Sequence, residues 1–147
     1  MPFLSKRFAR DMAKCIQENY FMQFDMITYT PLSKKSLRKR DYNQAYLLAK
    51  EISKILDIPL ADLLIKVRKT KEQKSLNSRE RKTNVYGAFD LKDKDIVINK
   101  RILLIDDVKT TGSTLNECAK MLNIYGAQSV WAATLAVAVP KEKGDKK

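Results

Sequence analysis

Apolar and polar positions follow one another along the chain in a pattern that predicts strands alternating with helices. The clearest strand covers residues 102–105, a continuous apolar run of the length expected for a strand buried on both faces. After a short polar stretch, apolar residues recur at the helical spacing i, i+3, i+4 and i+7. These residues are Leu115, Cys118, Ala119 and Leu122, and Gly126 follows at the C′ position where glycine ends many helices. The sequence therefore predicts a strand, a tight turn and a helix.

Two further helices are predicted from the same spacing. The first begins near Ser5 and has an apolar face made of Phe8, Met12 and Ile16. Asn43 is a candidate N-cap for the second. Its apolar stripe consists of Ala45, Leu48, Ile52 and Ile55.

Strands are predicted at residues 25–29, 89–91 and 96–98, and a last buried strand at residues 130–139. Residues 60–67 are apolar and fit either a helix or a strand. Strands that alternate with helices imply an α/β fold with a mainly parallel, doubly wound sheet flanked by helices. In such a sheet, ligands bind outside the carboxyl ends of the strands, which is where the polar turn after residue 105 lies.

The length of 147 residues corresponds to one domain. We expect an N-terminal helix in residues 1–24, an α/β domain in residues 25–139 and a charged tail in residues 140–147. No apolar run reaches the roughly 18 residues that a membrane-spanning helix needs, and no signal peptide is visible. The lone cysteines Cys15 and Cys118 fit a reducing compartment, so we expect a cytoplasmic protein.

The turn after residue 105 combines two acids with a run of hydroxyl side chains. A strand-to-helix turn directs free backbone N–H groups and the positive end of a helix dipole to one place, where a phosphate can bind. Gly112 permits close approach or a positive φ. Asp106 and Asp107 would repel a phosphate, so they must face hydroxyl groups or a cation. A sugar phosphate with free ring hydroxyls would satisfy both the phosphate-binding turn and the two acids. The hydroxyl donors are Thr110, Thr111, Ser113 and Thr114.

Positive charge is concentrated in two segments. The chain has 29 basic and 17 acidic residues, a net charge of +12, which favours a polyanionic partner such as nucleic acid or phosphorylated small molecules. Residues 33–40 contain five basic residues and no acid, and residues 66–82 contain eight basic residues and two acids. A lysine-rich composition, or a solvated face, is the alternative explanation.

The composition also excludes several classes of site. The chain has no histidine, which removes His general bases, Ser-His-Asp triads and His metal ligands. Its two cysteines lack C-x-x-C spacing, so no structural zinc site is expected. Four glycines cannot supply a G-x-G-x-x-G or Walker A motif. A receiver domain needs a phosphoacceptor Asp and a Lys well downstream, whereas only Asp145 follows Asp107.

Residues 105–114 (IDDVKTTGST) resemble the phosphoribosyl pyrophosphate (PRPP) signature of type I phosphoribosyltransferases. Other features, spread over about residues 25–137, resemble the ComF family of competence-associated proteins. Asp41 replaces a glycine that is usual in that family, and the cysteine-rich zinc-binding segment that members commonly carry is lacking. We therefore expect a naturally short member or a fragment. The matching residues are Pro31-Leu32, Arg40-Asp41-Tyr42-Asn43-Gln44-Ala45, Gln73, Leu76, Arg81, Asn84 and Gly87-Ala88-Phe89.

The resemblance implies that the two acids bind the ribose hydroxyls of PRPP and that residues 110–114 hold its 5′-phosphate. Mg²⁺ would accompany PRPP near the acids, because this ion prefers oxygen ligands and phosphates. Residues 66–82 match a flexible loop that closes over the site. The implied PRPP-binding residues are Asp106, Asp107, Val108, Lys109, Thr110, Thr111, Gly112, Ser113 and Thr114. The implied pyrophosphate loop consists of Leu32, Ser33, Lys34, Lys35, Arg38 and Arg40.

Two functions stay open at this stage. The ComF resemblance implies a role in natural transformation, with single-stranded DNA and other DNA-uptake proteins as partners. Tyr42 and Tyr46 could stack on bases or pack the second helix. The alternative is an active Mg-dependent phosphoribosyltransferase of nucleotide metabolism, for which neither an acceptor nor a catalytic residue can be named. Candidate DNA-binding residues are Lys35, Arg38, Arg40, Lys69, Lys71, Lys74, Arg79, Arg81 and Lys82.

Overall fold

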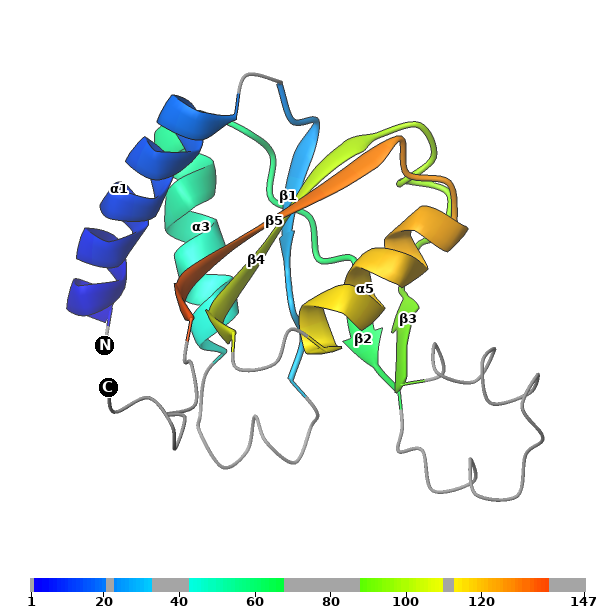
Figure 1. Ribbon diagram of the computed structural model, residues 1–147. Helices are drawn as coiled ribbons and strands as arrows, with labels where there is room; N and C mark the ends of the chain where they lie inside the picture. The colour runs from blue at the N-terminus through cyan, green and yellow to red at the C-terminus, as the bar shows by residue number, and fades with distance from the viewer. Residues whose placement is uncertain (1, 21–22, 33–42, 68–87, 110–112, 138–147) are drawn as a thin grey trace, which may run out of the picture.

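The computed structural model describes residues 2–20, 23–32, 43–67, 88–109 and 113–137. Helices lie on both sides of a central sheet (Figure 1), as the sequence predicts for an α/β fold. The helices are α1 (Pro2–Asn19), α3 (Gln44–Leu56) and α5 (Ser113–Ile124). The strands are β1 (Met26–Tyr29), β2 (Leu64–Lys66), β3 (Phe89–Leu91), β4 (Arg101–Lys109) and β5 (Ser129–Val137).

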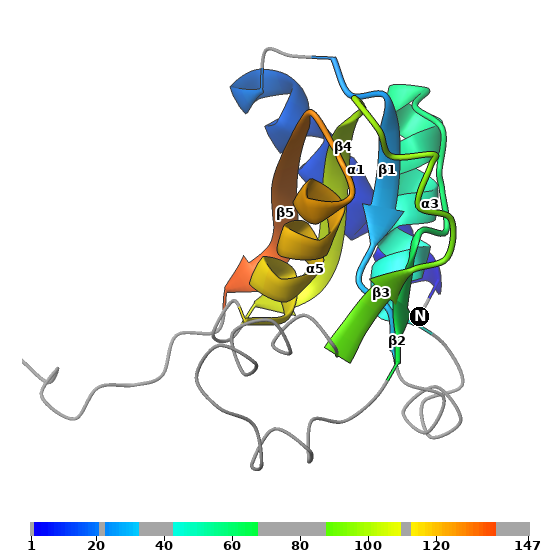
Figure 2. The same ribbon diagram turned by 90° about the vertical axis from the view of Figure 1, so that its right-hand side faces the viewer.

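The central sheet has three parallel strands in the order β1-β4-β5. Helices α1 and α3 cover one face and α5 covers the other (Figures 1 and 2). The smaller antiparallel pair of β2 and β3 packs beside α5. Figure 1 shows β4 and β5 ending at the same lower edge, as parallel strands must.

The middle strand β4 is buried on both faces. Leu103 and Ile105 pack with α1 and α3, whereas Ile102 and Leu104 pack with α5 and β3. This explains why the sequence has four consecutive apolar residues here, since a strand covered on both sides has no polar alternation. The prediction of a buried parallel strand at residues 102–105 is confirmed.

The predicted helices are confirmed, with changes at their edges. α1 begins at Pro2 rather than Ser5, and Met12 and Ile16 are buried on the predicted face. The side chain of Asn43 caps α3 by accepting hydrogen bonds from the backbone of Ala45 and Tyr46. In the stripe of α3, however, Ile55 is 43% exposed, because it lies in the last turn of the helix.

The predicted helix after the turn also forms. α5 buries Leu115, Cys118 and Leu122 against the sheet. Gly126 has φ +103 and follows the last turn, as predicted for a C′ glycine. A side chain would be strained at that φ, and a Cβ atom would lie 3.5 Å from Ile98.

One strand prediction is wrong, and another is confirmed as a strand but not as a buried one. Residues 96–98 form a turn in which Val97 is buried and its neighbours Ile96 and Ile98 are exposed. This apolar alternation results from a turn that inserts one side chain into the core. The strand predicted as buried at residues 130–139 is β5, which lies at an edge of the central sheet and leaves Trp131 39% exposed.

Residues 60–67, which fit either a helix or a strand, contain the short strand β2. It pairs with β3, and Leu64 and Leu91 are buried partners in that ladder. The loop predicted at residues 66–82 lies outside the described residues from residue 68 onward. Among the described helices, none has the length and apolar character to cross a membrane.

Candidate functional site

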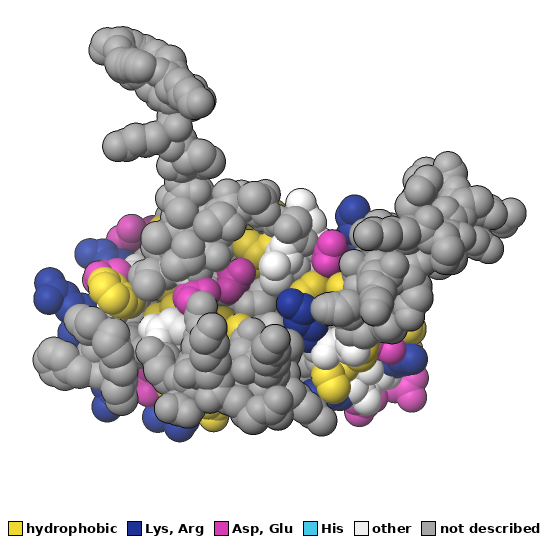
Figure 3. Space-filling view, turned by 90° about the horizontal axis from the view of Figure 1, so that it is seen from below, with side chains coloured by type: hydrophobic (Ala, Val, Ile, Leu, Met, Phe, Trp, Pro, Cys, Tyr) yellow, Lys and Arg dark blue, Asp and Glu magenta, His cyan; other side chains and the backbone are white. Residues whose placement is uncertain are grey.

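The two acids of the sequence motif lie at the carboxyl end of the middle strand. β4 continues through Asp106 and Asp107 to Lys109, so the turn starts later than the sequence suggested. β4 runs beside β1 and β5, which places both acids between two neighbouring strand ends. Figure 3 looks onto this end of the molecule and shows acidic side chains near its centre. The expected ligand edge of the sheet therefore carries the expected acids.

Asp106 points into the fold. It is 9% exposed, and its Oδ1 accepts two hydrogen bonds, from Thr30 Oγ1 at 2.8 Å and from the backbone N of Asp107 at 2.8 Å. Burial, together with the neighbouring Asp107 carboxyl group, raises the pKa of Asp106 to about 6 against the opposing effect of the Thr30 hydrogen bond. Asp106 is thus a buried acid with fixed partners at one oxygen.

Asp107 is half-buried and faces the opposite side of the sheet, because successive side chains alternate along a strand. Asp106 is on the face of Ile102 and Leu104, and Asp107 is on the face of Leu103 and Ile105. The side chain of Asp107 is nevertheless close enough to that of Asp106 to raise the pKa of the Asp106 carboxyl.

Thr30 directly follows the last residue of β1. Its backbone N–H, its carbonyl and its hydroxyl each form a hydrogen bond. Its N donates to Ile105 O at 3.1 Å, and its hydroxyl donates to Asp106. Its carbonyl accepts from Asn43 Nδ2 at 3.0 Å. Thr30 is 5% exposed, so these bonds lie away from water. The ends of β1 and β4 and the start of α3 are joined through this residue.

This role of Thr30 is not apparent from the amino-acid sequence. A threonine before a proline at a strand end is typical of any strand terminus, and its contact with Asp106 spans 76 positions. Asn43 was predicted as an N-cap, which is confirmed, but its second bond to Thr30 was not predicted. No local pattern in the sequence carries the signal for either contact.

The predicted PRPP-binding residues are only in part described. Asp106 and Asp107 lie together at the edge, Val108 and Lys109 continue β4, and Thr114 is exposed in the first turn of α5, which Ser113 begins. The first turn of α5 follows the end of β4 in the chain, as a strand–turn–helix requires. Outside the described residues are Thr110, Thr111 and Gly112.

Most residues of the predicted basic loops also fall outside the described residues. Leu32 is half-buried and follows β1, next to the carboxyl edge. The remaining members, which are not described, are Ser33, Lys34, Lys35, Arg38, Arg40, Lys69, Lys71, Lys74, Arg79, Arg81 and Lys82.

The charged residues are distributed unevenly between the described residues and the rest of the chain. The described residues include 13 basic and 12 acidic residues, a net charge of +1, whereas the remaining residues include 16 basic and 5 acidic ones, a net charge of +11. Residues 33–42 join β1 to α3, and residues 68–87 join β2 to β3. The described part of the domain is therefore nearly neutral.

The contacts of Tyr46 distinguish between its two predicted roles, which are stacking on bases and packing of the second predicted helix. Its ring packs edge-on against Tyr29, with 5.2 Å between the ring centroids. This supports packing of α3 on β1 rather than a free stacking surface. Tyr42 lies outside the described residues.

The described residues contain no group of three or more acids or cysteines placed to hold a metal ion. Cys15 is exposed on α1, and Cys118 is buried on α5, where burial raises the pKa of its thiol. Carboxylate oxygens suit Mg²⁺, which retains waters and phosphate ligands and needs only one or two protein groups. The carboxylates of Asp106 and Asp107 fit that requirement in their chemistry.

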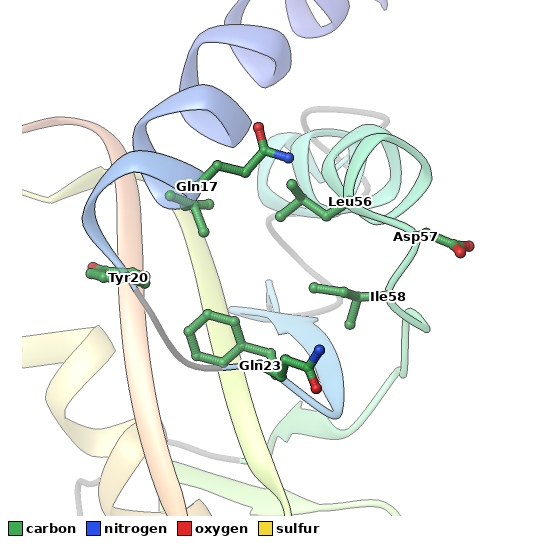
Figure 4. Close-up of a pocket in the computed structure, with 8 residues that line it drawn as sticks. Gln17, Tyr20, Gln23, Leu56, Asp57 and Ile58 are labelled. Carbon is green, nitrogen blue, oxygen red and sulfur yellow. The ribbon is translucent and has the colours of Figure 1, made fainter.

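A separate hollow of about 550 Å³ lies at the opposite edge of the sheet (Figure 4). It separates the C-terminal ends of α1 and α3 and is lined by Ile16, Tyr20, Phe24, Leu56 and Ile58. Figure 4 shows the nearby acid, Asp57, pointing away from it. This hollow has no part in the acidic site.

Comparison with known proteins agrees with the geometry. The family described as "Phosphoribosyl transferase domain" matches residues 42–147. The chain belongs to this family. Within it, the chain is ComF-like: it is 41% identical over 100 residues to Competence protein F of Haemophilus influenzae, which covers 67% of this chain and 44% of that protein. It is 33% identical over 129 residues to Competence protein ComFC of Bacillus subtilis, covering 87% of this chain and 51% of that protein.

The ComF-like chain thus spans about half the length of the curated relatives that it matches. Its fold is similar to that of the allosteric regulatory enzyme of purine biosynthesis, with a TM-score of 0.61 at 21% identity over 89% of this chain and 25% of that one. The expected phosphoribosyltransferase fold is confirmed.

The buried acid Asp106 predicts a pH dependence of stability. Its pKa is about 6 in the folded chain against an ordinary value of 3.8. The folded state therefore holds the proton more tightly, and the stabilisation that this gives is complete below pH 3.8 and lost as the pH rises through about 6. In Asp106→Asn, the amide oxygen can still accept both hydrogen bonds but cannot ionise.

We expect Asp106→Asn to unfold with a free energy about 2 kcal/mol higher than the wild type at pH 7.5, and with a smaller difference at pH 5. Urea unfolding at both pH values measures this. Equal differences at pH 5 and pH 7.5 would show that Asp106 is already ionised across the range.

Proposed function

We propose that this ComF-like domain binds PRPP at the carboxyl end of β4 and acts in DNA uptake. The observation that carries the proposal is the pair of acids at the end of the buried middle strand, followed by the first turn of α5. The relatives' names, Competence protein F and Competence protein ComFC, support the role in DNA uptake.

The proposed division of labour follows from chemistry. Carboxylates accept hydrogen bonds from ribose hydroxyls and favour a sugar that gains positive charge. The start of α5 and the hydroxyl run before it would hold the 5′-phosphate through N–H and O–H donors. Basic residues of the 33–40 segment would hold the pyrophosphate. Mg²⁺, when bound, would neutralise part of the pyrophosphate charge and polarise the bond to the sugar.

The two acids, Asp106 and Asp107, have different roles in this proposal. Asp107 is half-buried and therefore more accessible than the buried Asp106, so it would make the main contact with the ribose. Asp106 keeps Oδ1 for Thr30 and the backbone of Asp107, so any ribose contact would use its other oxygen. We therefore assign the larger share of ribose binding to Asp107.

Binding of single-stranded DNA is the second part of the proposal. The segments at residues 33–42 and 68–87 contain twelve of the 29 basic residues. Lys and Arg at that density release counterions from DNA phosphates and give an affinity that falls with salt. PRPP and DNA would then share basic residues and compete for them.

A second candidate is an active phosphoribosyltransferase, which the family membership favours. In transfer from PRPP, the bond between ribose C1 and the pyrophosphate oxygen breaks, and a nucleophile bonds to C1. The acids would stabilise the cation-like sugar, and the basic segment would stabilise the leaving pyrophosphate.

One sample can test both candidates. Isothermal titration with PRPP and Mg²⁺, followed by fluorescence titration with a labelled oligothymidylate, should show saturable binding of both. Pyrophosphate release is then followed in the presence of adenine, guanine, hypoxanthine, uracil and orotate. Release with one base identifies an enzyme, and binding without release supports the DNA-uptake role. Failure to bind either ligand would contradict the proposed function.

A further inference from the structure

The first half of α1 carries three exposed basic side chains, Lys6, Arg7 and Arg10. Residues 6 and 10 are four positions apart and residues 7 and 10 are three apart, so on a helix these side chains are neighbours on one face. The buried residues Ala9 and Met12 belong to the other face of the helix. The three cations therefore form one continuous surface, which we call the α1 patch.

No acid among the described residues forms an ion pair with the α1 patch. Asp11 is exposed and lies four positions after Arg7, but a cation that precedes its acid at this spacing is the less favourable order in a helix. Several other described cations do have acidic partners, and so their charge is partly neutralised. These pairs are Lys54–Glu51, Lys92–Asp62, Lys94–Asp90 and Arg101–Asp25.

The α1 patch lies at the same end of the molecule as the acidic site. Figure 1 shows that α1 begins at the level where β4 and β5 end, and that it runs from there toward the opposite edge of the sheet. Figure 3 looks onto this end and shows Lys and Arg side chains on the side of the molecule that α1 occupies. A long polyanion that reaches the acidic site can therefore also cross the α1 patch.

The apolar face of α1 is not available to a lipid surface. Ala9, Met12, Ala13 and Ile16 are buried in one core cluster with residues of α3 and β4. An amphipathic helix that binds a membrane buries its apolar face at the boundary of the acyl chains, and here the fold already covers that face. Binding through charge alone suits the phosphates of a nucleic-acid backbone, which attract Lys and Arg through the release of counterions.

We propose that the α1 patch is a further contact surface for single-stranded DNA, in which Lys6, Arg7 and Arg10 each bind a backbone phosphate. This inference rests on the proposed function, because it assumes that the domain binds DNA. The patch contributes affinity without sequence preference, since contacts to phosphates do not read bases.

Three variants test the α1 patch. Lys6→Gln/Arg7→Gln/Arg10→Gln removes its charges and keeps residues that favour a helix. The matched control, Lys50→Gln/Lys54→Gln/Lys100→Gln, removes the same charge from exposed lysines on α3 and before β4. Lys6→Arg/Arg7→Lys/Arg10→Lys exchanges the side chains and keeps their charge. Circular dichroism and unfolding midpoints in urea show whether each variant keeps the fold.

The affinity for a labelled oligothymidylate is measured by fluorescence titration between 50 and 200 mM salt. Loss of three phosphate contacts should lower the slope of log affinity against log salt by about 2, because each contact to a single strand contributes about 0.7. The fall in affinity over this fourfold range of salt should then be about 20-fold smaller than in the wild type. The control and the charge-conserving variant should keep the slope of the wild type.

Equal slopes in the α1 variant and the matched control would overturn the α1 patch as a DNA contact, while DNA binding by the domain itself stands. Sedimentation with vesicles of phosphatidylglycerol and phosphatidylcholine gives a second comparison. If the α1 variant loses vesicle binding but keeps the wild-type DNA slope, the patch faces a membrane and the inference is wrong. If the wild type does not bind the oligothymidylate at all, the proposed DNA binding fails, which is a distinct result.

Discussion

Asp107→Asn is expected to weaken PRPP binding by about 10- to 100-fold without loss of the fold. The carboxylate of Asp107 is half-buried at the carboxyl edge, where it would accept charge-assisted hydrogen bonds from ribose hydroxyls. Such bonds contribute about 1.5–3 kcal/mol each, which corresponds to that range of affinity. Calorimetry with PRPP and Mg²⁺ measures the change.

The matched control is Asp95→Asn. Asp95 is an exposed acid in the turn before β4, at the opposite end of the strand, so the same change in charge falls outside the site. We expect its PRPP affinity to stay within twofold of the wild type. If Asp107→Asn and Asp95→Asn bind PRPP equally well, Asp107 is not a ribose ligand.

Reversing three charges in the 68–87 segment is expected to reduce DNA affinity strongly at low salt. In Lys69→Glu/Lys71→Glu/Lys74→Glu, each lost phosphate contact should lower the slope of log affinity against log salt by about 0.7 for a single strand. Three lost contacts lower the slope by about 2. Fluorescence titration of a labelled oligonucleotide between 50 and 200 mM salt measures both quantities.

The control for this variant is Lys14→Glu/Lys54→Glu/Lys100→Glu. These three lysines are exposed and lie away from the carboxyl edge, two in the C-terminal halves of helices and one before β4. The net charge of the two variants is the same, so a difference between them reflects position. Equal slopes in the two variants would show that DNA binding, if present, follows the net charge alone.

Much of the domain could be predicted from local patterns. The continuous apolar run at residues 102–105 predicted a buried strand, because only a strand covered on both faces needs no polar position. The spacing of Leu115, Cys118 and Leu122 predicted α5, and Asn43 predicted a helix start, since both signals act within one or two turns.

The predictions that failed depend on contacts far apart in sequence. The turn at residues 96–98 has a strand-like composition, and only the core around Val97 decides that a single side chain enters it. β5 has the composition of a buried strand, but no strand among the described residues lies beyond it in the central sheet.

The candidate site likewise has one part that the sequence predicts and one part that depends on distant contacts. The acids and the hydroxyl run could be found from residues 105–114 alone, because they follow one another in the chain. The anchoring of Asp106 could not, because Thr30 is 76 positions away and an isolated threonine carries no signal. The resulting rise in the pKa of Asp106 follows from burial, which is also a property of the folded chain.

We propose that PRPP binds where β4 ends and α5 begins. Hydrogen–deuterium exchange of the wild type, with and without PRPP and Mg²⁺, tests this claim directly. We predict slower exchange in peptides that cover residues 105–116, and unchanged exchange in peptides from the hollow between the ends of α1 and α3. Binding that slows exchange elsewhere but leaves residues 105–116 unaffected would contradict the claim.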